Sequence, residues 1–269
     1  MKYRVVLVVG ASSGIGASIA NHLSKCGYVV YGTSRKPFSV DTPFMPLILD
    51  VNNEESIADA INVILQEHNT IDVLINCAGW GIGGPIELCE EKDIRQIMDT
   101  NFFGVDRLVR AVLPVMRNNR KGLILNTSSV GGLMGLPCQG FYSASKFALE
   151  GYSEALYLEL KPFGIDVVLI EPGDFNTGFN ANRYWTPKLN EESPYWEKSQ
   201  LAKSKIDNDE NFGSHPHILA VKVEKILKTR NPRFRYVVAI PIQKLSVYVK
   251  RIIPSHWYLW IIGKYYGIR

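Results

Sequence analysis

The sequence predicts a doubly wound α/β fold, in which helices cover both faces of a parallel sheet. Short runs rich in Val, Ile and Leu alternate with segments of helical periodicity along much of the 269-residue chain, which is typical of strands joined by helical crossovers. The runs are apolar at nearly every position, so we expect each strand to be buried on both faces. Such helical crossovers join parallel strands and are right-handed, so we expect a parallel sheet.

The alternation can be followed element by element from the N-terminus. The expected strands span residues 3–9, 28–34, 46–50, 71–76, 122–128 and 165–172. The expected helices span residues 15–25, 54–67, 90–117 and 141–161. In such a sheet, ligands bind beyond the carboxyl ends of the strands, so the residues that follow each strand are the candidates for a site.

The composition is that of one soluble globular domain. Hydrophobic residues make up 46% of the chain and charged residues 21%, and neither a low-complexity linker nor an internal repeat divides it. We therefore expect a single domain over residues 1–269. The four cysteines show no C-x-x-C spacing, and no apolar signal region precedes the first strand, so the sequence indicates a cytoplasmic location.

The first strand ends in the glycine-rich turn VVGASSGIG. Glycine lets the backbone approach a phosphate, and the N-terminus of the next helix supplies N–H donors, so the turn indicates a pyrophosphate site. The candidate residues are Gly10, Ser12, Ser13, Gly14, Ile15 and Gly16. A purely structural tight turn is one alternative. A hydrolase nucleophile elbow, G-x-S-x-G, is another, disfavoured because the turn follows the first strand and Asp and His partners have no evident place.

The next two strand ends indicate which nucleotide binds. Ser34 and Arg35, followed by Lys36, offer two cations and no carboxylate, which suits the 2′-phosphate of NADP better than the free hydroxyl of NAD. The alternative is a solvated basic loop. Asp50, with Val51 after it, is a candidate partner for the adenine, although capping of the following helix is nearly as good an interpretation of Asp50.

The later strand ends and helices carry residues suited to hydride transfer. Tyr142 and Lys146 are four residues apart on one face of a predicted helix. We expect the Lys ammonium to lower the pKa of the phenol, which makes it an acid and base near neutral pH. Ser129, at the end of the fifth strand, is placed to hydrogen-bond the same substrate oxygen. Because the cofactor supplies the hydride, the protein has only to move one proton and hold one oxygen.

Two further sites concern asparagines. After the fourth strand, Asn76, Ala78 and Gly79 combine small residues where a flat cofactor passes close to the backbone. Asn101 lies within a predicted helix, where asparagine is a poor helix former. Its presence there indicates a kink or a buried hydrogen bond.

Together these motifs resemble the short-chain dehydrogenase/reductase family over about residues 4–180. The motifs are Gly10-x-x-x-Gly14-x-Gly16, Asn76-x-Ala78-Gly79, Ser129, Tyr142-x-x-x-Lys146 and EPGDFNTG. The resemblance implies a Rossmann-type fold. Val9, where the family often has Thr, and Cys77, in place of a commoner Asn, are departures at supporting positions.

The resemblance also implies a role for each site residue. It implies Tyr142 as proton donor or acceptor, with Lys146 lowering its pKa and binding the nicotinamide ribose. It implies Ser129 as the ligand of the substrate oxygen, with Ser128 as the structural alternative, and Asn101 as the holder of a water in a proton relay. The candidates beside the nicotinamide are Pro172, Gly173, Phe175 and Thr177.

The segments SVGGLMGLP and YSASKFALEGYSEALYLELKPFGI are similar to the estradiol-type hydroxysteroid and retinol dehydrogenase branch of that family. We therefore expect an enzyme that interconverts a secondary alcohol and a ketone on a bulky apolar, steroid- or retinoid-like substrate. NADP(H) is favoured over NAD(H), and the resemblance implies a homodimer or homotetramer. The alternatives are a 3-oxoacyl-thioester reductase of fatty-acid synthesis and a non-catalytic nucleotide-sensing protein.

Residues 180–216 break the alternation and are expected to form a substrate loop. A long loop at a strand end is usually functional, and its aromatic residues suit a lid over a bulky apolar substrate. These aromatics are Tyr184, Trp185, Tyr195 and Trp196. The alternative is that they pack the loop onto its own domain. His215 and His217 lack a third ligand nearby, so helix capping near Ser214 is favoured and no metal is expected.

Residues 242–269 form a basic, aromatic and amphipathic extension. From residue 222 onward there are eleven Lys and Arg residues and one acid, Glu224, although the whole chain carries a net charge of only +4. Bases mixed with Trp and Tyr are typical of a segment on a membrane surface. Packing against the substrate pocket or a second subunit is favoured over such peripheral contact, because Pro254 interrupts a short apolar run. Nucleic-acid binding is not expected, since the aromatics lie in apolar runs.

Overall fold

A seven-stranded parallel sheet forms the centre of the molecule. The computed structural model describes residues 2–179 and 182–269. The strand order is β3-β2-β1-β4-β6-β7-β9, and every pair runs parallel. The strands are β1 Val5–Val9, β2 Val29–Ser34, β3 Met45–Ile48, β4 Val73–Asn76, β6 Gly122–Thr127, β7 Ile165–Pro172 and β9 Arg235–Val238. The predicted doubly wound fold is confirmed.

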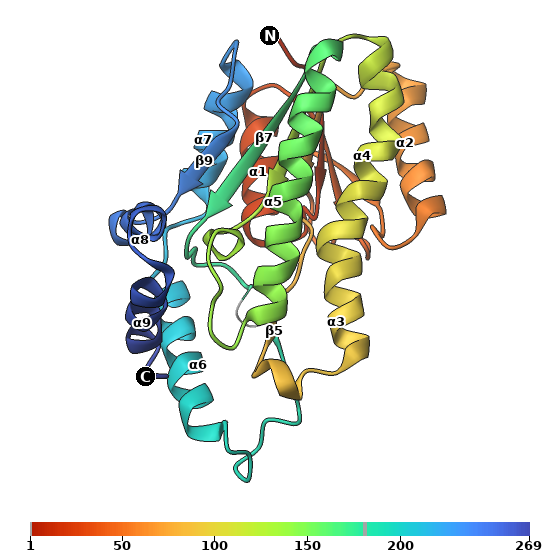
Figure 1. The fold of residues 1–269 in the computed structure, drawn as a ribbon. Coiled ribbons are helices and arrows are strands. Elements are labelled where there is room, and N and C mark those ends of the chain that lie inside the picture. Colours follow the sequence, from red (N-terminus) through yellow and green to blue (C-terminus); the bar gives the residue numbers. More distant parts are fainter. Residues whose placement is uncertain (1, 180–181) are drawn as a thin grey trace.

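Helices cover both faces of this sheet (Figure 1). On one face α2, α4 and α5 pack over one hydrophobic cluster, and on the other α1 and α7 pack over a second. The α-helices are α1 Gly14–Lys25, α2 Glu54–His68, α3 Glu91–Met98, α4 Gly104–Asn118, α5 Gly140–Leu160, α6 Trp196–Asn211, α7 His217–Lys228, α8 Pro241–Ile252 and α9 Ser255–Tyr265. The 3₁₀ turns are η1 Ile86–Leu88, η3 Val130–Gly132 and η4 Lys161–Phe163.

The strand register divides the core between the two faces. Leu7 of β1 is paired with Tyr31 of β2 and Leu74 of β4, and all three side chains are buried in the first cluster. Their neighbours Val6 and Val8 are buried in the second cluster. Because successive strand residues point to opposite faces, an apolar run of this kind fills two cores at once. The chain order reverses between β1 and β4, and at this switch point the strand ends open onto a site.

The predicted helix over residues 90–117 is interrupted in its middle. A π-helical turn, η2 Asp99–Phe103, separates α3 from α4. Asn101 lies in this turn with 1% of its surface exposed. Single π turns occur mostly at functional sites. The expectation that Asn101 needs a kink or a buried hydrogen bond is therefore confirmed.

The expected loop over residues 180–216 is in large part ordered structure. Residues 196–211 form the helix α6, and β8 Tyr184–Trp185 pairs with β5 Ile82–Gly83 in a small second sheet. Residues 180 and 181 of this loop lie outside the described residues. The prediction of a continuous loop was wrong because α6 buries only a narrow stripe, of Ser199, Ala202 and Ile206, so its apolar periodicity is weak.

The C-terminal helices lie near the carboxyl ends of the strands, together with α6 (Figure 1). They pack against the segment that follows β6, where Val130 and Met134 form a cluster with Val247 of α8 and Tyr258 of α9. Within the described residues, no helix combines the length and the apolar character needed to cross a membrane.

Candidate active site

The glycine turn after β1 is held close to the turn after β4. Gly10 has a φ of +82°, in the left-handed region, and a Cβ there would lie 2.7 Å from the backbone nitrogen of Ala78. A Cβ on Gly16 would lie 2.1 Å from the carbonyl oxygen of Gly10. Only glycine fits these two positions, so the turn brings the N-terminus of α1 against the strand ends. Such a terminus supplies donors to a phosphate.

One cavity of about 1060 Å³ runs along these strand ends and contains most of the predicted site. The predicted residues on its wall are Gly10, Ser12, Ser13, Gly14, Ile15, Gly16, Ser34, Arg35, Asp50, Val51, Ala78, Gly79, Ser129, Tyr142, Lys146, Pro172, Gly173, Phe175 and Thr177. Two predicted residues, Asn76 and Asn101, are not on the wall. Because the wall draws on the ends of the main-sheet strands β1, β2, β3, β4, β6 and β7, the switch point of the sheet is the candidate active site.

The ends of β2 and β3 line one part of this active-site cavity. Arg35 and Lys36 both line it and are exposed. Asp50 accepts a hydrogen bond from the backbone N–H of Asn52 at 3.0 Å. The helix α2 is capped instead by Asn53, whose side chain accepts from the N–H of Ser56 at 3.0 Å. The alternative that Asp50 caps this helix is therefore wrong.

Tyr142, Lys146 and Ser129 meet deep in the active-site cavity. The Ser129 Oγ accepts a hydrogen bond from the N–H of Gly131 at 3.0 Å. A Cβ on Gly131 would lie 3.3 Å from Cε1 of Tyr142 and 3.4 Å from the Ser129 Oγ, so both side chains border the same point. The Lys146 Nζ donates to the carbonyl oxygen of Thr127 at 2.8 Å and lies 5.9 Å from the centre of the Tyr142 ring.

The electrostatics of this group differ from the sequence expectation. Burial raises the pKa of Tyr142, while a hydrogen bond with Ser129 and the charge of Arg183 act in the lowering direction. Burial lowers the pKa of Lys146 to about 8. The expected lowering of the phenol pKa is not found, because desolvation of the phenolate dominates and the Lys146 ammonium is directed at a carbonyl oxygen. At neutral pH the phenol keeps its proton and can donate it.

Asn101 acts on the backbone beside the cavity. Its Oδ1 accepts from the N–H of Trp80 at 3.1 Å, and its Nδ2 donates to the carbonyl oxygen of Trp80 at 3.0 Å and to the Ser145 Oγ at 3.1 Å. The π turn thus places the Asn101 side chain between the loop after β4 and the helix α5, and its hydrogen bonds join the two. The amide of Asn76 lies deeper, donating to Asn126 at 2.8 Å. The relay water at Asn101 and cofactor contact at Asn76 stay predictions.

The expected aromatic lid does not face the cavity. Tyr184 packs edge-on against Trp80, with ring centres 6.3 Å apart, and a Cβ on Gly83 would lie 2.7 Å from the ring of Trp185. The Tyr195 hydroxyl donates to Glu87 at 2.5 Å. None of the four predicted lid aromatics is on the cavity wall. The alternative, packing onto the rest of the domain, describes these side chains better.

Several cavity residues have no signal in the sequence. Arg183 is buried, pairs with Glu210, and lies with its guanidinium carbon 5.5 Å from the ring centre of Phe179. Phe179 in turn lies 5.8 Å from the ring centre of Tyr142. Gln243 of α8 contacts both the N–H and the carboxylate of Asp174, after β7. Arg183 and Gln243 lie outside the family motifs, so only the fold brings them to the site.

The helices α8 and α9 form the apolar wall of the active-site cavity. Val249, Tyr258 and Ile262 line it, and the glycine turn that carries the nucleotide candidates lines the same cavity. The Tyr258 hydroxyl lies 2.9 Å from the Ser246 Oγ and donates to the Met134 sulfur at 3.0 Å. The cavity therefore joins a polar end, suited to a nucleotide, to an apolar end, suited to a hydrocarbon chain.

Known proteins resemble this chain over its whole length. A family model described as short chain dehydrogenase matches residues 4–187. A 3-ketodihydrosphingosine reductase of Bacteroides thetaiotaomicron is 45% identical over 269 residues, which cover 100% of both chains. Retinol dehydrogenase 8 of Bos taurus is 35% identical over 253 residues, which cover 86% of this chain and 80% of the relative. The crystal structure of a short-chain dehydrogenase from Streptomyces avermitilis is 31% identical, with a TM-score of 0.83, and the match covers 93% of this chain and 94% of the other.

Proposed function

The chain belongs to the short-chain dehydrogenase/reductase family of oxidoreductases, and from this premise we propose that it reduces a ketone on a long-chain lipid to a secondary alcohol, with NADPH as the reductant. The observation that carries the proposal is the half-buried phenol of Tyr142 beside Ser129. Its pKa is raised by burial, so it holds a proton at neutral pH. Ketone reduction requires that form, because the carbonyl oxygen has to receive a proton as the hydride arrives.

In this mechanism the bound cofactor supplies the hydride to the carbonyl carbon. Ser129 holds the substrate oxygen: its Oγ accepts from the N–H of Gly131, and its own proton, which is directed at the Tyr142 oxygen, is donated to the substrate oxygen when the substrate binds between them. Tyr142 gives its proton to that oxygen as the alcohol forms. Lys146 contributes a positive charge beside the site. Its Nζ donates one hydrogen bond to the carbonyl oxygen of Thr127 and has further N–H donors for a ligand. No covalent bond between substrate and protein is needed.

The preference for NADP(H) over NAD(H) rests on the end of β2. Arg35 and Lys36 line the cavity where the adenosine ribose is expected, and the strand ends without a carboxylate. Two cations favour a 2′-phosphate, whereas NAD-specific sites place an acid at this point to bind the 2′-hydroxyl. The close approach at Gly10 and Gly16 supports a pyrophosphate beside them.

The substrate class rests on the apolar end of the cavity and on a relative. The wall made by Val249, Tyr258 and Ile262 suits a hydrocarbon chain. The relative of 45% identity over both full chains is a 3-ketodihydrosphingosine reductase, whose substrate joins a ketone to such a chain. A steroid or retinoid substrate, the sequence expectation, is the second candidate, supported by the retinol dehydrogenase of 35% identity.

Reduction of 3-ketodihydrosphingosine in detergent micelles, followed by the loss of NADPH absorbance, tests this function. We expect turnover in the wild type and a fall of at least about 10²-fold in Tyr142→Phe, because the proton donor is lost. Tyr152→Phe is the matched control, since Tyr152 lies on the same helix but donates to Asp106. Undiminished turnover in Tyr142→Phe would refute the mechanism. Reduction of retinal or estrone, with none of the sphingoid ketone, would refute the substrate class.

We further propose that the protein is cytoplasmic and binds reversibly to a membrane that holds its substrate. Exposed apolar side chains on α8 and α9, called here the C-terminal apolar face, support this. They are Ile242, Leu245, Tyr248, Ile252, Trp257, Leu259, Trp260, Ile261 and Tyr265. Leu245 and Ile261 also line the cavity, so the face is continuous with the substrate site. Family membership also supports a homodimer or homotetramer.

A further inference from the structure

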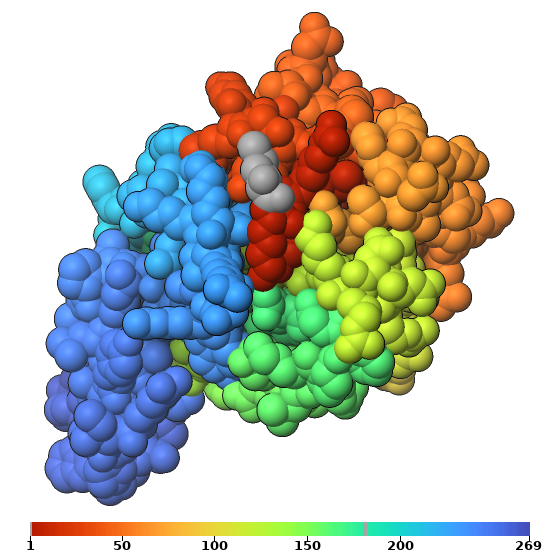
Figure 2. Space-filling model, turned by 90° about the horizontal axis from the view of Figure 1, so that it is seen from above, coloured from red at the N-terminus to blue at the C-terminus, as the bar shows by residue number. Residues whose placement is uncertain are grey.

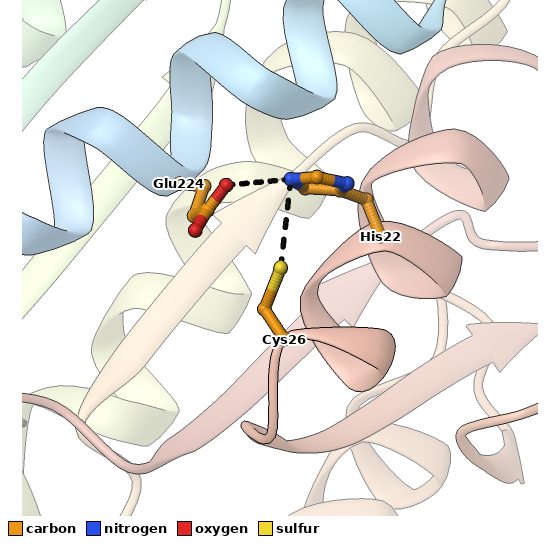
Figure 3. Close-up of side chains that lie close together, drawn as sticks. All are labelled: His22, Cys26 and Glu224. Atoms are coloured by element: carbon orange, nitrogen blue, oxygen red, sulfur yellow. Dashed lines mark hydrogen bonds and ion pairs between the residues drawn. The ribbon is translucent and has the colours of Figure 1, made fainter.

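Three side chains of metal-binding type converge on the face of the sheet covered by α1 and α7, outside the active-site cavity. His22 and Cys26 come from the C-terminal end of α1, and Glu224 comes from α7 (Figure 3). The His22 Nε2 lies 2.7 Å from the Glu224 Oε2 and 3.7 Å from the Cys26 Sγ. All three ligand atoms lie within 4.8 Å of one another.

Helix packing fixes this triangle. His22 and Cys26 are four residues apart, which places them on one face at the end of α1. Directly beneath, Leu23 of α1 and Ala220 and Val223 of α7 are buried in one hydrophobic cluster. Because the two backbones are packed together in the core, the three side chains meet without any loop having to order.

The distance between the His22 and Cys26 ligand atoms is close to that in a tetrahedral zinc site. Zn–S and Zn–N bonds of about 2.3 and 2.0 Å place the sulfur and nitrogen atoms about 3.5 Å apart in a tetrahedron. The His22 and Cys26 ligand atoms are 3.7 Å apart. A nitrogen and an oxygen ligand would be about 3.4 Å apart, so the Glu224 carboxylate, now at 2.7 Å, has to withdraw slightly along its flexible side chain.

We propose that His22, Cys26 and Glu224 form a binding site for a divalent transition metal of the Zn²⁺ class. A thiolate, an imidazole and a carboxylate favour Zn²⁺ or Co²⁺ over Mg²⁺, which takes oxygen ligands. Three protein ligands leave the fourth position to water. His217 at the start of α7 lies edge-on to His22, with ring centres 5.1 Å apart, and borders the same place.

Lys228 is the residue that opposes the metal. Its Nζ lies 2.5 Å from the Glu224 Oε1, the carboxylate oxygen that does not face His22. The other oxygen is therefore left for the metal, but the Lys228 charge weakens the attraction to a cation. A variant without this charge should bind the metal more tightly, whereas a variant that lacks one of the three ligands should bind it more weakly.

A bound metal would join α1 to α7. The helix α1 begins at Gly14, within the glycine turn of the cofactor candidates, and ends beside the metal ligands. The site would thus stabilise the half of the fold that presents the nucleotide without touching the chemistry. By linkage, Zn²⁺ at about a hundredfold excess over its Kd should raise the Tm by roughly 5 °C or more.

Titration of the reduced, metal-stripped, full-length protein with Zn²⁺ alone tests the site. We expect one equivalent to bind with a Kd on the order of micromolar, and Co²⁺ to give a thiolate-to-metal charge-transfer band. Cys26→Ser should remove the band, and both it and Glu224→Gln should weaken binding at least about tenfold. Lys228→Met should strengthen binding. Mg²⁺ should neither bind nor change the Tm.

Cys89→Ser is the matched control, since Cys89 is another free, partly buried cysteine, remote from the cluster; it should keep the band and the affinity. NADPH turnover in Cys26→Ser, unchanged from wild type, would show that this variant is folded. A cobalt spectrum without a thiolate band would overturn the proposal. Equal affinities in Cys26→Ser and Cys89→Ser, or a Kd weaker than about 100 µM, would do the same.

Discussion

At the residue scale, burial acts on Tyr142 and Lys146 in opposite senses. It raises the pKa of the phenol and lowers the pKa of the ammonium to about 8, because in each case the charged form loses its hydration. The phenol is therefore protonated at neutral pH, and the amine, though charged there, loses its proton at mildly alkaline pH. As the pH rises, Lys146 therefore loses its charge before Tyr142 loses its proton.

Ketone reduction should be constant below about pH 7 and fall as the pH rises through about 8, because Lys146 is charged below its pKa of about 8 and neutral above it. The measurement is kcat/KM for the ketone from pH 6 to 10 at saturating NADPH. Tyr152→Phe should show the same profile as wild type. A rate that stays level to pH 10 would contradict the role of the Lys146 charge.

Arg35 should decide between the two nucleotides. Arg35→Ala should raise the KM for NADPH by about 10- to 100-fold, the range for a lost hydrogen bond to a charged group, and leave the KM for NADH nearly unchanged. Arg117→Ala, an exposed arginine of α4 away from the cavity, is the control. Equal losses with both nucleotides, or a wild type that prefers NADH, would contradict the proposed cofactor.

The sequence predicts residues that lie at strand ends or at helical spacing, and misses those that arrive from elsewhere. Ser129, Tyr142 and Lys146 share one short segment, so their proximity can be read from their spacing. Gln243 and Glu224 are brought to their places by the docking of distant helices. No metal was expected because the sequence signal considered, His215 and His217, lacks a third ligand; the cluster at His22 is visible only once α1 and α7 are paired.

At the scale of elements, the strands and helices that the sequence predicts correctly are those with strong apolar periodicity. Most strands and helices of the first 172 residues are close to their expected bounds, since α1, α2, α4 and α5 and the central strands bury broad apolar faces. In contrast, α6 has a narrow buried stripe, and β9, over Arg235–Val238, is a partly buried edge strand. The sequence predicts an irregularity in the helix at Asn101, but it does not predict that the Asn101 side chain links the loop after β4 to α5.

The docking of α8 should depend on Gln243. Its side chain contacts Asp174 at two points, and a Cβ on Gly173 would lie 2.0 Å from the Gln243 Oε1, so the helix rests directly on the loop after β7. Gln243→Ala should lower the free energy of unfolding by about 1–2 kcal/mol and speed proteolysis near residue 240. Urea unfolding and limited proteolysis measure this. Lys244→Ala, exposed on the same helix, should behave as wild type, and equal behaviour of both variants would contradict the role of Gln243.

At the scale of the whole molecule, the C-terminal helices α8 and α9 combine basic side chains with exposed apolar side chains. The C-terminal helices stand out as an arm beside the body of the molecule (Figure 2). The arm is basic, with Lys244, Lys250, Arg251 and Lys264 and no acid between residues 241 and 269. Ile252 is 81% exposed and Trp257 is 56% exposed. Basic side chains beside exposed Trp and Ile suit the surface of an anionic bilayer.

The full-length protein should therefore sediment with vesicles containing phosphatidylserine and much less with pure phosphatidylcholine, since each base near an anionic surface contributes about 1 kcal/mol. The double variant Ile252→Ser/Trp257→Ser should lose most of this binding, because it removes two exposed apolar side chains from the C-terminal apolar face. Ile48→Ser, 59% exposed at the opposite edge of the sheet, should bind as wild type does. The same face would instead be a subunit interface if light scattering showed a wild-type oligomer that the double variant converts to a monomer. That result, or equal sedimentation with both kinds of vesicle, would contradict membrane binding.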